Sequence, residues 1–244
     1  MKFENLTFVT YKWKAMPGYR SKFTAEHVNI LARMIGRNYK APHEVVCVTD
    51  EPDGIDSSIR VVPLWDEFKD IPSPHDGLGR LRRNPSCYRR LRMFRRDARE
   101  WLGERICSMD LDTVITADLT VMLDRPENFI IYGDTNPTSP YNGSLILFTA
   151  GARAQLYEEF DPVKSPPMGL SRGYYGSDQA WIGVCLGPNE PKWSRRDGVY
   201  SYRNDLGPNH RELPHNARLV IFHGWTDPWS PEAQEFAWVR RHYR

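Results

Sequence analysis

Short apolar runs, rich in β-branched residues, recur along this chain and are separated by polar or turn-forming stretches. Runs of this length and composition are typical of buried β-strands. We predict strands over residues 6–10, 44–50, 60–64, 106–112, 127–132, 144–148 and 218–222. Because these runs are continuously apolar rather than alternating, they favour a sheet that is covered on both faces.

Helical patterns lie between the strands. Val28, Leu31, Ala32 and Ile35 have the spacing of an amphipathic helix, which we predict to open at residue 24. Further helices are predicted at 86–102, 152–160, 177–186 and the C-terminal end, and the Pro- and Gly-rich stretches 66–85 and 162–176 are predicted as loops. Since strand, helix and strand follow one another, we predict an α/β fold with a mixed, mostly parallel sheet flanked by helices.

Composition narrows the class of protein. The chain has 244 residues, 40% hydrophobic and 26% charged, and we predict a single domain over 1–244. No apolar run is long enough to span a bilayer, and the first residues lead almost directly into a strand, so we expect no signal peptide and a cytoplasmic location. The four cysteines are widely spaced, which favours reduced thiols over a zinc site or a disulfide framework.

Asp110 and Asp112 stand at the end of one apolar run. Side chains alternate along an extended segment, so these two carboxylates project to the same side, at the edge where open α/β sheets bind ligands. Carboxylate oxygens suit Mg²⁺ or Mn²⁺, and such an ion could hold a diphosphate. The alternative interpretation is a polar strand end or a helix cap.

Other polar residues also stand at predicted strand ends or helix starts, and each has a structural alternative. His223 is either a metal ligand or a satisfied polar residue, and Asp178 either a site residue or a helix N-cap. Asn142 precedes Gly143 and is either a site residue or part of a turn. Tyr11 and Trp13, which follow the first strand, either contact a nucleoside or are core and loop aromatics.

Five segments carry a resemblance to a known family. They are Arg89-Arg90-Leu91, Met109-Asp110-Leu111-Asp112, Asn142 to Phe148, Ser177-Asp178-Gln179 and Phe222 to Trp229. In this order they resemble motifs of the GT-A glycosyltransferases of the glycogenin and bacterial lipopolysaccharide galactosyltransferase type, which are metal-dependent and retaining. The resemblance extends from the first strand to Trp229. It implies a Rossmann-like GT-A domain that transfers a sugar from a nucleoside-diphosphate donor, expected to be UDP-linked, to an acceptor.

The resemblance also implies roles for individual residues. Asp110, Asp112 and His223 would bind Mn²⁺ or Mg²⁺, which neutralises the charge that develops on the departing diphosphate. The catalytic positions facing the donor sugar and the acceptor would be Asn142, Asp178 and Gln179. The donor-binding positions would be Thr10, Tyr11, Trp13, Asp50, Arg90, Gly224 and Trp225.

This chain departs from the family pattern at two places. Gly143-Ser144 stands where the family has Ser-Gly, and Asp227 stands where the family commonly has a lysine that contacts the diphosphate. A carboxylate at that place would repel the leaving group, so a cation from elsewhere must compensate. The candidates are Arg90, Arg92, Lys12 and Lys14.

An arginine-rich stretch supports a rival interpretation. The net charge of +2 is too small to indicate nucleic-acid binding by itself, but arginines crowd one part of the chain. They are Arg80, Arg82, Arg83, Arg89, Arg90, Arg92, Arg95, Arg96 and Arg99. This patch is either the main contact of a nucleic-acid or anionic-polymer binding module, or a surface that steers an anionic acceptor such as a phosphorylated glycan or a modified nucleic acid, or a solvated helix face with internal acidic partners. For the protein as a whole, a third alternative to an active glycosyltransferase and a binding module is a catalytically degenerate transferase that serves as a scaffold.

Overall fold

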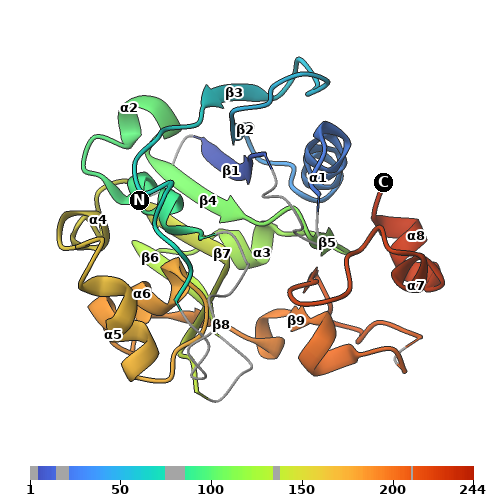
Figure 1. Ribbon diagram of the computed structural model, residues 1–244. Helices are drawn as coiled ribbons and strands as arrows, with labels where there is room; N and C mark the ends of the chain where they lie inside the picture. The colour runs from blue at the N-terminus through green and yellow to red at the C-terminus, as the bar shows by residue number, and fades with distance from the viewer. Residues whose placement is uncertain (1–4, 15–21, 75–85, 134–137, 210) are drawn as a thin grey trace.

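The computed structural model describes residues 5–14, 22–74, 86–133, 138–209 and 211–244 (Figure 1). Its main sheet has seven strands in the order β3-β2-β1-β4-β7-β6-β8. Their bounds are β1 Leu6–Lys12, β2 His43–Thr49, β3 Arg60–Pro63, β4 Arg105–Met109, β6 Phe129–Gly133, β7 Tyr141–Thr149 and β8 Lys192–Trp193. Only β7 pairs antiparallel, with β4 on one side and β6 on the other, among the described strands of this sheet. The predicted mixed, mostly parallel α/β sheet is confirmed.

A second, smaller sheet begins immediately after β4. It contains β5 (Thr113–Ile115), β10 (Leu219–Ile221) and β9 (Val199–Ser201) in that order. The prediction of one unbroken strand over 106–112 was therefore wrong, since β4 ends at Met109 and β5 starts at Thr113. The Asp110 N–H still donates to the Ser144 carbonyl oxygen at 3.0 Å, so the chain leaves the main sheet just beyond that residue. As a result, the two aspartates lie at the junction between the two sheets.

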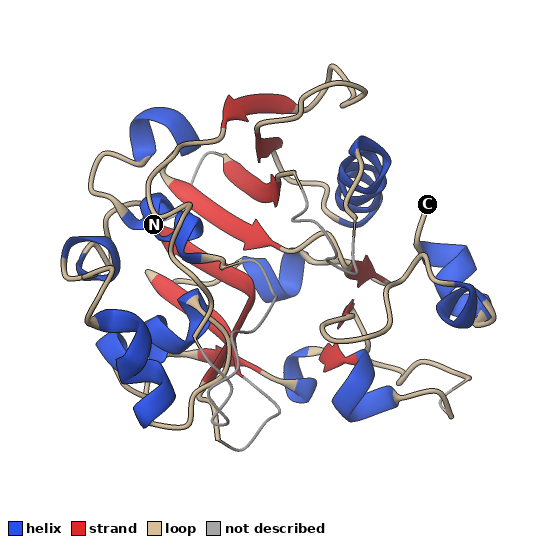
Figure 2. Ribbon diagram, viewed as in Figure 1, coloured by secondary structure: helices blue, strands red, loops and turns tan. Residues whose placement is uncertain are grey.

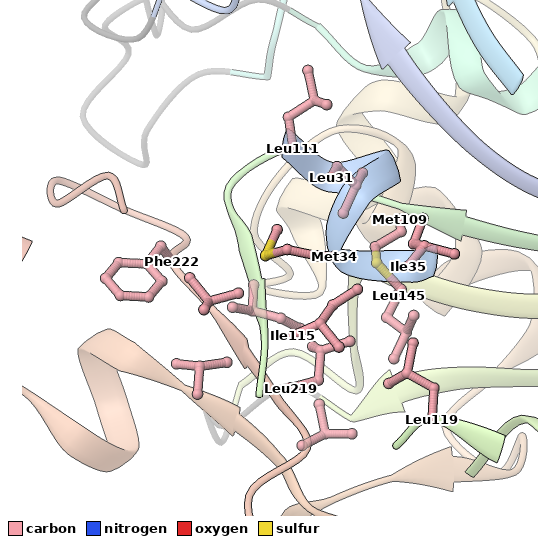
Figure 3. Close-up of a cluster of buried hydrophobic side chains, with 14 of the residues drawn as sticks. Leu31, Met34, Ile35, Met109, Leu111, Ile115, Leu119, Leu145, Leu219 and Phe222 are labelled. Carbon is pink, nitrogen blue, oxygen red and sulfur yellow. The ribbon is translucent and has the colours of Figure 1, made fainter. Parts of the chain in front are cut away.

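Helix α1 (Ala25–Asn38) covers one face of the main sheet, as its periodicity predicts. Its buried residues Leu31, Met34 and Ile35 belong to a core that also contains residues of β4, β5, β7 and β10. Figure 3 shows these side chains gathered with Met109 and Leu219 from the two sheets. This shared core fixes the small sheet against the large one.

The predicted helix over 86–102 was wrong. The chain instead forms a 3₁₀ helix, η1 (Tyr88–Phe94), and a single turn of α-helix, α2 (Arg99–Leu102), separated by an extended Arg95. Tyr88, Leu91 and Phe94 are all buried and are three residues apart, which matches the three-residue turn of a 3₁₀ helix. The prediction that Leu91 and Phe94 share a buried face is consistent with the structure, but these residues lie on a 3₁₀ helix rather than an α-helix.

Short helices cover the opposite face, where Figure 2 shows several together near the end of β6. They are α4 (Gln155–Glu158), α5 (Ser165–Ser171) and α6 (Asp178–Leu186). Helix α5 lies within the stretch 162–176, so the loop prediction there was wrong; its Pro166 and Pro167 occupy the first helical turn, where proline is tolerated. The remaining helices, α3 (Thr120–Leu123), α7 (Pro231–Gln234) and α8 (Ala237–His242), lie near the small sheet or the C-terminus.

No helix in the described part of the chain has both the length and the apolar character needed to cross a membrane. The four cysteines are free thiols.

Candidate functional site

Arg90 is the centre of a buried ionic cluster, here called the Arg90 cluster, that also contains Asp110 and Asp178. The Arg90 Nε donates to Asp178 Oδ2 at 2.7 Å, and Arg90 Nη2 lies 2.6 Å from the same oxygen. Arg90 Nη1 donates to Asp110 Oδ1. These three residues come from η1, from the chain just after β4 and from the first turn of α6, and the structure brings them together.

Burial and charge act in opposite directions within this cluster. Burial by itself would lower the pKa of Arg90, but the carboxylates of Asp110 and Asp178 raise that pKa well above its usual range. Burial raises the pKa of Asp178, and Arg90 opposes that effect. Arg90 is 5% exposed and Asp178 3% exposed, so each charge depends on its partner rather than on water.

Gly143 on β7 leaves room for the arginine. A Cβ atom at this position would lie 2.8 Å from Arg90 Nη2 and 3.5 Å from the Cβ of Gln179. The Gly143 N–H donates to Gln179 Oε1 at 3.2 Å, so the same glycine also orients Gln179. The departure from the family order at this position thus has a steric reason in this chain.

Neighbouring residues at the starts of β7 and α6 are held by local hydrogen bonds. Asn142 is buried, and its Oδ1 accepts the Ser144 N–H at 2.9 Å. Ser177 occupies the N-cap position of α6, but its hydroxyl accepts the Cys87 N–H at 2.8 Å instead of capping the helix. Asp178 is the first residue of α6, and its carboxylate pairs with Arg90.

The end of β1 borders the Arg90 cluster. Tyr11 is buried, and its hydroxyl has no hydrogen-bond partner among the described residues. Burial raises the pKa of Tyr11, and Arg90, Asp178 and Asp110 are the charges that act on it. The Tyr11 ring contacts Trp13 at a centroid distance of 6.3 Å, so both aromatics stand beside the cluster.

Two further residues predicted to bind the donor lie near the same sheet edge. The buried Thr10 hydroxyl has no partner among the described residues, and it points to the opposite face of β1 from Tyr11, since strand side chains alternate. Asp50 follows β2, and its Oδ1 accepts the Lys14 N–H at 3.2 Å, which ties the ends of β1 and β2 together.

His223 follows β10 and is anchored from two sides. The Phe222 N–H donates to the Asp112 carbonyl oxygen at 2.8 Å, which brings the end of β10 beside the aspartates. The His223 Nε2 lies 2.8 Å from the Ser201 hydroxyl, which also accepts the Asn204 N–H at 3.0 Å. Ser201 is thus a site residue that the sequence did not suggest, because a serine at the end of a three-residue strand carries no distinctive pattern.

The imidazole of His223 is neutral at physiological pH. Its pKa is lowered to about 4, mainly by burial and also by Arg203, while Asp110 opposes the shift. A neutral ring is the form that binds metals, and the Ser201 hydroxyl is positioned to accept the Nε2 proton and leave Nδ1 for a metal.

Asp110, Asp112 and His223 form a donor set that fits Mn²⁺ or Mg²⁺, with hard oxygens and one imidazole. Among the described residues, no group of three or more His, Cys, Asp and Glu side chains is gathered around a common metal position. The metal assignment therefore stays a prediction.

The closing segment after His223 contains the last two predicted donor-binding residues. Gly224 has φ +116°, and a Cβ there would lie 3.0 Å from the Cδ of Arg203. Trp225 is 82% exposed. Asp227 is buried, and both it and Asp112 raise the pKa of Tyr243, after the larger effect of burial. Asp227 and Asp112 therefore lie on the same side of the site.

Comparisons with solved structures identify the fold that carries these residues. A structure of the galactosyltransferase LgtC in complex with donor and acceptor sugar analogues is similar over 97% of this chain and 93% of LgtC, with 12% identity and a TM-score of 0.57. The chain has the GT-A glycosyltransferase fold. The bifunctional glycosyltransferase WbbM is similar over 94% of this chain, with 14% identity and a TM-score of 0.58.

The glycosyltransferase GlyE from Streptococcus pneumoniae TIGR4 shares the GT-A fold over 92% of this chain, with 10% identity and a TM-score of 0.58. This chain spans about half the length of WbbM and GlyE, at 48% and 57%. An LgtC variant in which an active-site glutamine is replaced by glutamate also matches, with 12% identity and a TM-score of 0.56. No protein-family model and no curated protein sequence matches the chain.

A cavity of about 470 Å³ opens on this fold between the end of β6 and the turn that follows β9. Its lining residues are Tyr132, Gly133, Pro140, Lys192, Trp193, Ser194, Arg195, Asn204 and Asp205. Asp205 Oδ2 accepts the Ser201 N–H at 2.8 Å, so the wall of this cavity is continuous with the residue that holds His223.

The arginine patch is largely neutralised where the structure describes it. Arg92 pairs with Glu67 at 2.8 Å, Arg95 with Asp97 at 2.8 Å and Arg96 with Glu158 at 2.6 Å. The Arg89 guanidinium donates to the carbonyl oxygen of Trp65. Arg80, Arg82 and Arg83 lie outside the described residues. The pairing favours a solvated face with internal partners for the described arginines, and an anionic acceptor stays a prediction.

Proposed function

We propose that this protein transfers a sugar from a nucleoside-diphosphate sugar, UDP-linked by expectation, to an acceptor, with the help of Mn²⁺ or Mg²⁺ and with retention of the anomeric configuration. The observation that carries the proposal is the Arg90 cluster, which lies beside Gln179 and near His223 in a GT-A fold. A buried carboxylate held by an arginine gives a rigid polar group of the kind that positions a sugar. Because sequence identity to LgtC is low, the proposed reaction is supported by the residues of the site rather than by sequence similarity.

Residues of this chain have separate tasks in the proposed reaction. Tyr11 and Trp13 at the end of β1 would contact the nucleoside, and the Tyr11 hydroxyl would gain the partner it lacks among the described residues. Asp178 would accept hydrogen bonds from the donor sugar while Arg90 holds its carboxylate in place. Gln179, oriented by Gly143, would face the reacting carbon, as suggested by the active-site glutamine of LgtC.

Asp110, Asp112 and His223 would hold the metal ion. When bound, the ion supplies Lewis-acid stabilisation of the charge on the leaving diphosphate. The cavity lined by Asp205 would accommodate the acceptor, because Asp205 is hydrogen-bonded to Ser201, the residue that contacts His223. Its lining includes both Lys192 and Arg195, so it suits a polar acceptor.

Turnover of a panel of nucleoside-diphosphate sugars with Mn²⁺, measured by mass spectrometry, tests the proposal. The wild-type protein should consume at least one donor, and Asp178→Asn should reduce that turnover by about 100-fold or more, because the sugar loses a fixed anionic partner. UDP affinity should change little, since Asp178 faces the sugar. The matched control is Asp53→Asn, which alters an exposed aspartate in the loop between β2 and β3 that has no role in the proposed reaction.

Three results would count against the proposal. Absence of both donor turnover and Mn²⁺-dependent UDP binding in the wild type would refute it. Equal turnover in Asp178→Asn and wild type would remove the role of the Arg90 cluster. For the stereochemistry, NMR of the product settles the matter, and an inverted linkage would exclude a retaining reaction.

A further inference from the structure

Several carboxylates lie around the proposed diphosphate position. Asp110, Asp112, Asp178 and Asp227 all lie in or beside the site. Arg90 is the buried cation among them, and it is already engaged by Asp110 and Asp178. A diphosphate brought into such surroundings is repelled unless further positive charge faces it, because Coulomb interactions at partly buried sites amount to several kcal/mol. A divalent ion would supply part of that charge, and a protein cation that faces the diphosphate would supply more.

The cations considered from the sequence are mostly occupied. The Lys12 Nζ donates to the carbonyl oxygen of Glu51 at 2.9 Å and to its carboxylate at 3.0 Å. Arg92 pairs with Glu67 and lies over the Trp65 ring, 5.1 Å from its centroid. Lys14 is exposed at the end of β1. Of these candidates, Lys14 is the one whose side-chain ammonium has no bond to another described residue.

Arg203 lies on the other side of the site, in the π-helical turn η3 (Tyr202–Leu206). Its Nε donates to Asn204 Oδ1 at 3.3 Å, and among the described residues its guanidinium makes no ion pair with a carboxylate. The side chain lies against the backbone of Gly224, where a Cβ would be 3.0 Å from Cδ and 3.4 Å from Nη1. Glycine at position 224 therefore allows this arginine to approach the residue next to His223.

The turn that carries Arg203 is rigidly attached to the site. The Tyr202 ring stacks on Phe222 with centroids 4.4 Å apart and an interplanar angle of 10°. The Ser201 hydroxyl accepts the Asn204 N–H and contacts His223 Nε2, so the turn is fixed on both sides of Arg203. Arg203 also lowers the pKa of His223, after the larger effect of burial, which agrees with its closeness to the ring.

We propose that Arg203 is a diphosphate-binding residue of this protein, which reaches the leaving group from η3 across Gly224. The inference rests on the proposed function and adds to it a binding residue outside the segments that carry the family resemblance. Arginine suits the task because its planar guanidinium can donate two parallel hydrogen bonds to phosphate oxygens.

Calorimetric titration with UDP, UMP and uridine in the presence of Mn²⁺ tests the inference. Arg203→Gln should weaken UDP binding by about 10- to 100-fold, the loss expected for hydrogen bonds to a charged group. Uridine affinity should stay unchanged, since the nucleoside lies at the other end of the ligand. Arg203→Lys should retain part of the UDP affinity, because it keeps the charge but loses the paired donors.

Two other variants make the result specific. Arg196→Gln is the matched control, since Arg196 is an exposed arginine in the short helix η2 (Arg195–Asp197), before β9. Lys14→Gln tests the rival cation at the end of β1. Thermal unfolding without ligand shows that each variant is folded, and an exposed position such as Arg203 should change the midpoint little.

The possible outcomes separate the inference from the proposed function. If wild-type protein binds UDP and Arg203→Gln binds it equally well, the inference is overturned and the proposed function stands. A loss of UDP affinity in Lys14→Gln but not in Arg203→Gln would assign the role to Lys14 and also overturn it. If the wild type binds no nucleoside diphosphate with Mn²⁺, the proposed function itself fails.

Discussion

Arg90 and Arg203 both lie next to residues predicted to bind the metal, yet their surroundings differ. Arg90 is buried and makes ion pairs with Asp110 and Asp178 inside the protein. Arg203 is exposed and lies against the Gly224 backbone with no described carboxylate in contact. The first arginine is therefore needed for folding as well as for the site, whereas the second can be removed at little cost to stability. We therefore expect Arg90 to contribute mainly to the structure of the site and Arg203 mainly to ligand binding.

Loss of Arg90 should have the largest effect on stability. Arg90→Met would remove the ion-pair partner of the buried Asp178 carboxylate and of the partly exposed Asp110 carboxylate, so the free energy of unfolding should fall by about 3–5 kcal/mol. Urea denaturation measures the change. Arg96→Met, which removes an exposed arginine paired with Glu158, should leave the midpoint nearly unchanged. Equal effects of the two changes would show that the Arg90 cluster does not stabilise the fold.

A smaller cost is expected when the space for Arg90 is filled. Gly143→Ala places a methyl group 2.8 Å from Arg90 Nη2, and the overpacking should lower the free energy of unfolding by about 1–3 kcal/mol. Gly36→Ala in α1 is the control. A Cβ added at Gly36 would meet no atom of another part of the chain within 4 Å, and alanine is more favourable than glycine in a helix by about 1 kcal/mol. The two glycine variants should therefore shift the urea midpoint in opposite directions. A stabilised Gly143→Ala variant would contradict the close approach.

The His223 side of the site should respond in metal affinity more than in stability. Ser201→Ala removes the hydroxyl that orients the His223 ring, and Mn²⁺ affinity should fall by about 10- to 100-fold. Electron paramagnetic resonance of free Mn²⁺ measures this directly, and the free energy of unfolding should fall by only about 1 kcal/mol. Ser58→Ala, which alters an exposed hydroxyl bonded to Asp56, is the control. Unchanged Mn²⁺ affinity in Ser201→Ala would mean that the ring is oriented by other contacts.

The smallest expected effect is a pH dependence of stability that arises where Trp229 of the closing segment packs against His27 of α1. The ring of His27 stacks on Trp229 at 4.0 Å, and its Nδ1 accepts the Thr24 N–H at 2.9 Å. Burial lowers the pKa of His27 below its usual value of about 6.5, so the unfolded chain binds the proton first as pH falls. The contribution of neutral His27 to the free energy of unfolding is therefore fully present above about pH 6.5 and is lost as the pH falls below that value.

Thermal unfolding at pH 7.5 and 5.5 tests this pH dependence. The midpoint of the wild type should fall on acidification, and the fall should be smaller in His27→Gln. His215→Gln, which alters an exposed histidine, should behave as the wild type. An identical fall in wild type and His27→Gln would show that other groups cause the pH dependence.

Local patterns predicted the first part of the fold well. The strands β1, β2 and β3 and the helix α1 were expected close to their observed bounds, because each has a long apolar run or a clear helical period. Shorter elements such as β8, with two residues, have too few positions to show any period. The helix predicted over 86–102 failed for a related reason, since apolar residues spaced by three also fit a 3₁₀ helix.

The candidate site residues were also predicted from the sequence only where they stand in a recognisable local pattern. Asp110, Asp178 and Arg90 stand in recognisable motifs, and the structure brings them into contact. Their mutual pairing was not predicted, because it depends on how η1, β4 and α6 pack. Ser201 and Arg203 were missed altogether, since their positions follow from the turn η3 and from stacking of Tyr202 rather than from a local pattern.

The hydrogen bond from the Phe222 N–H to the Asp112 carbonyl oxygen joins two segments that are far apart in the sequence, so it forms only after both have been synthesised. Strands β1 to β4 come from the first half of the chain and can pair while the ribosome is still translating the second half. β10 joins β5 only after residues 219–221 have emerged, and His223 arrives with it. Since pairings between distant segments form slowly, we expect the Asp110–Asp112 segment to be in place before His223 joins it, so the predicted metal ligands would come together in the last steps of folding.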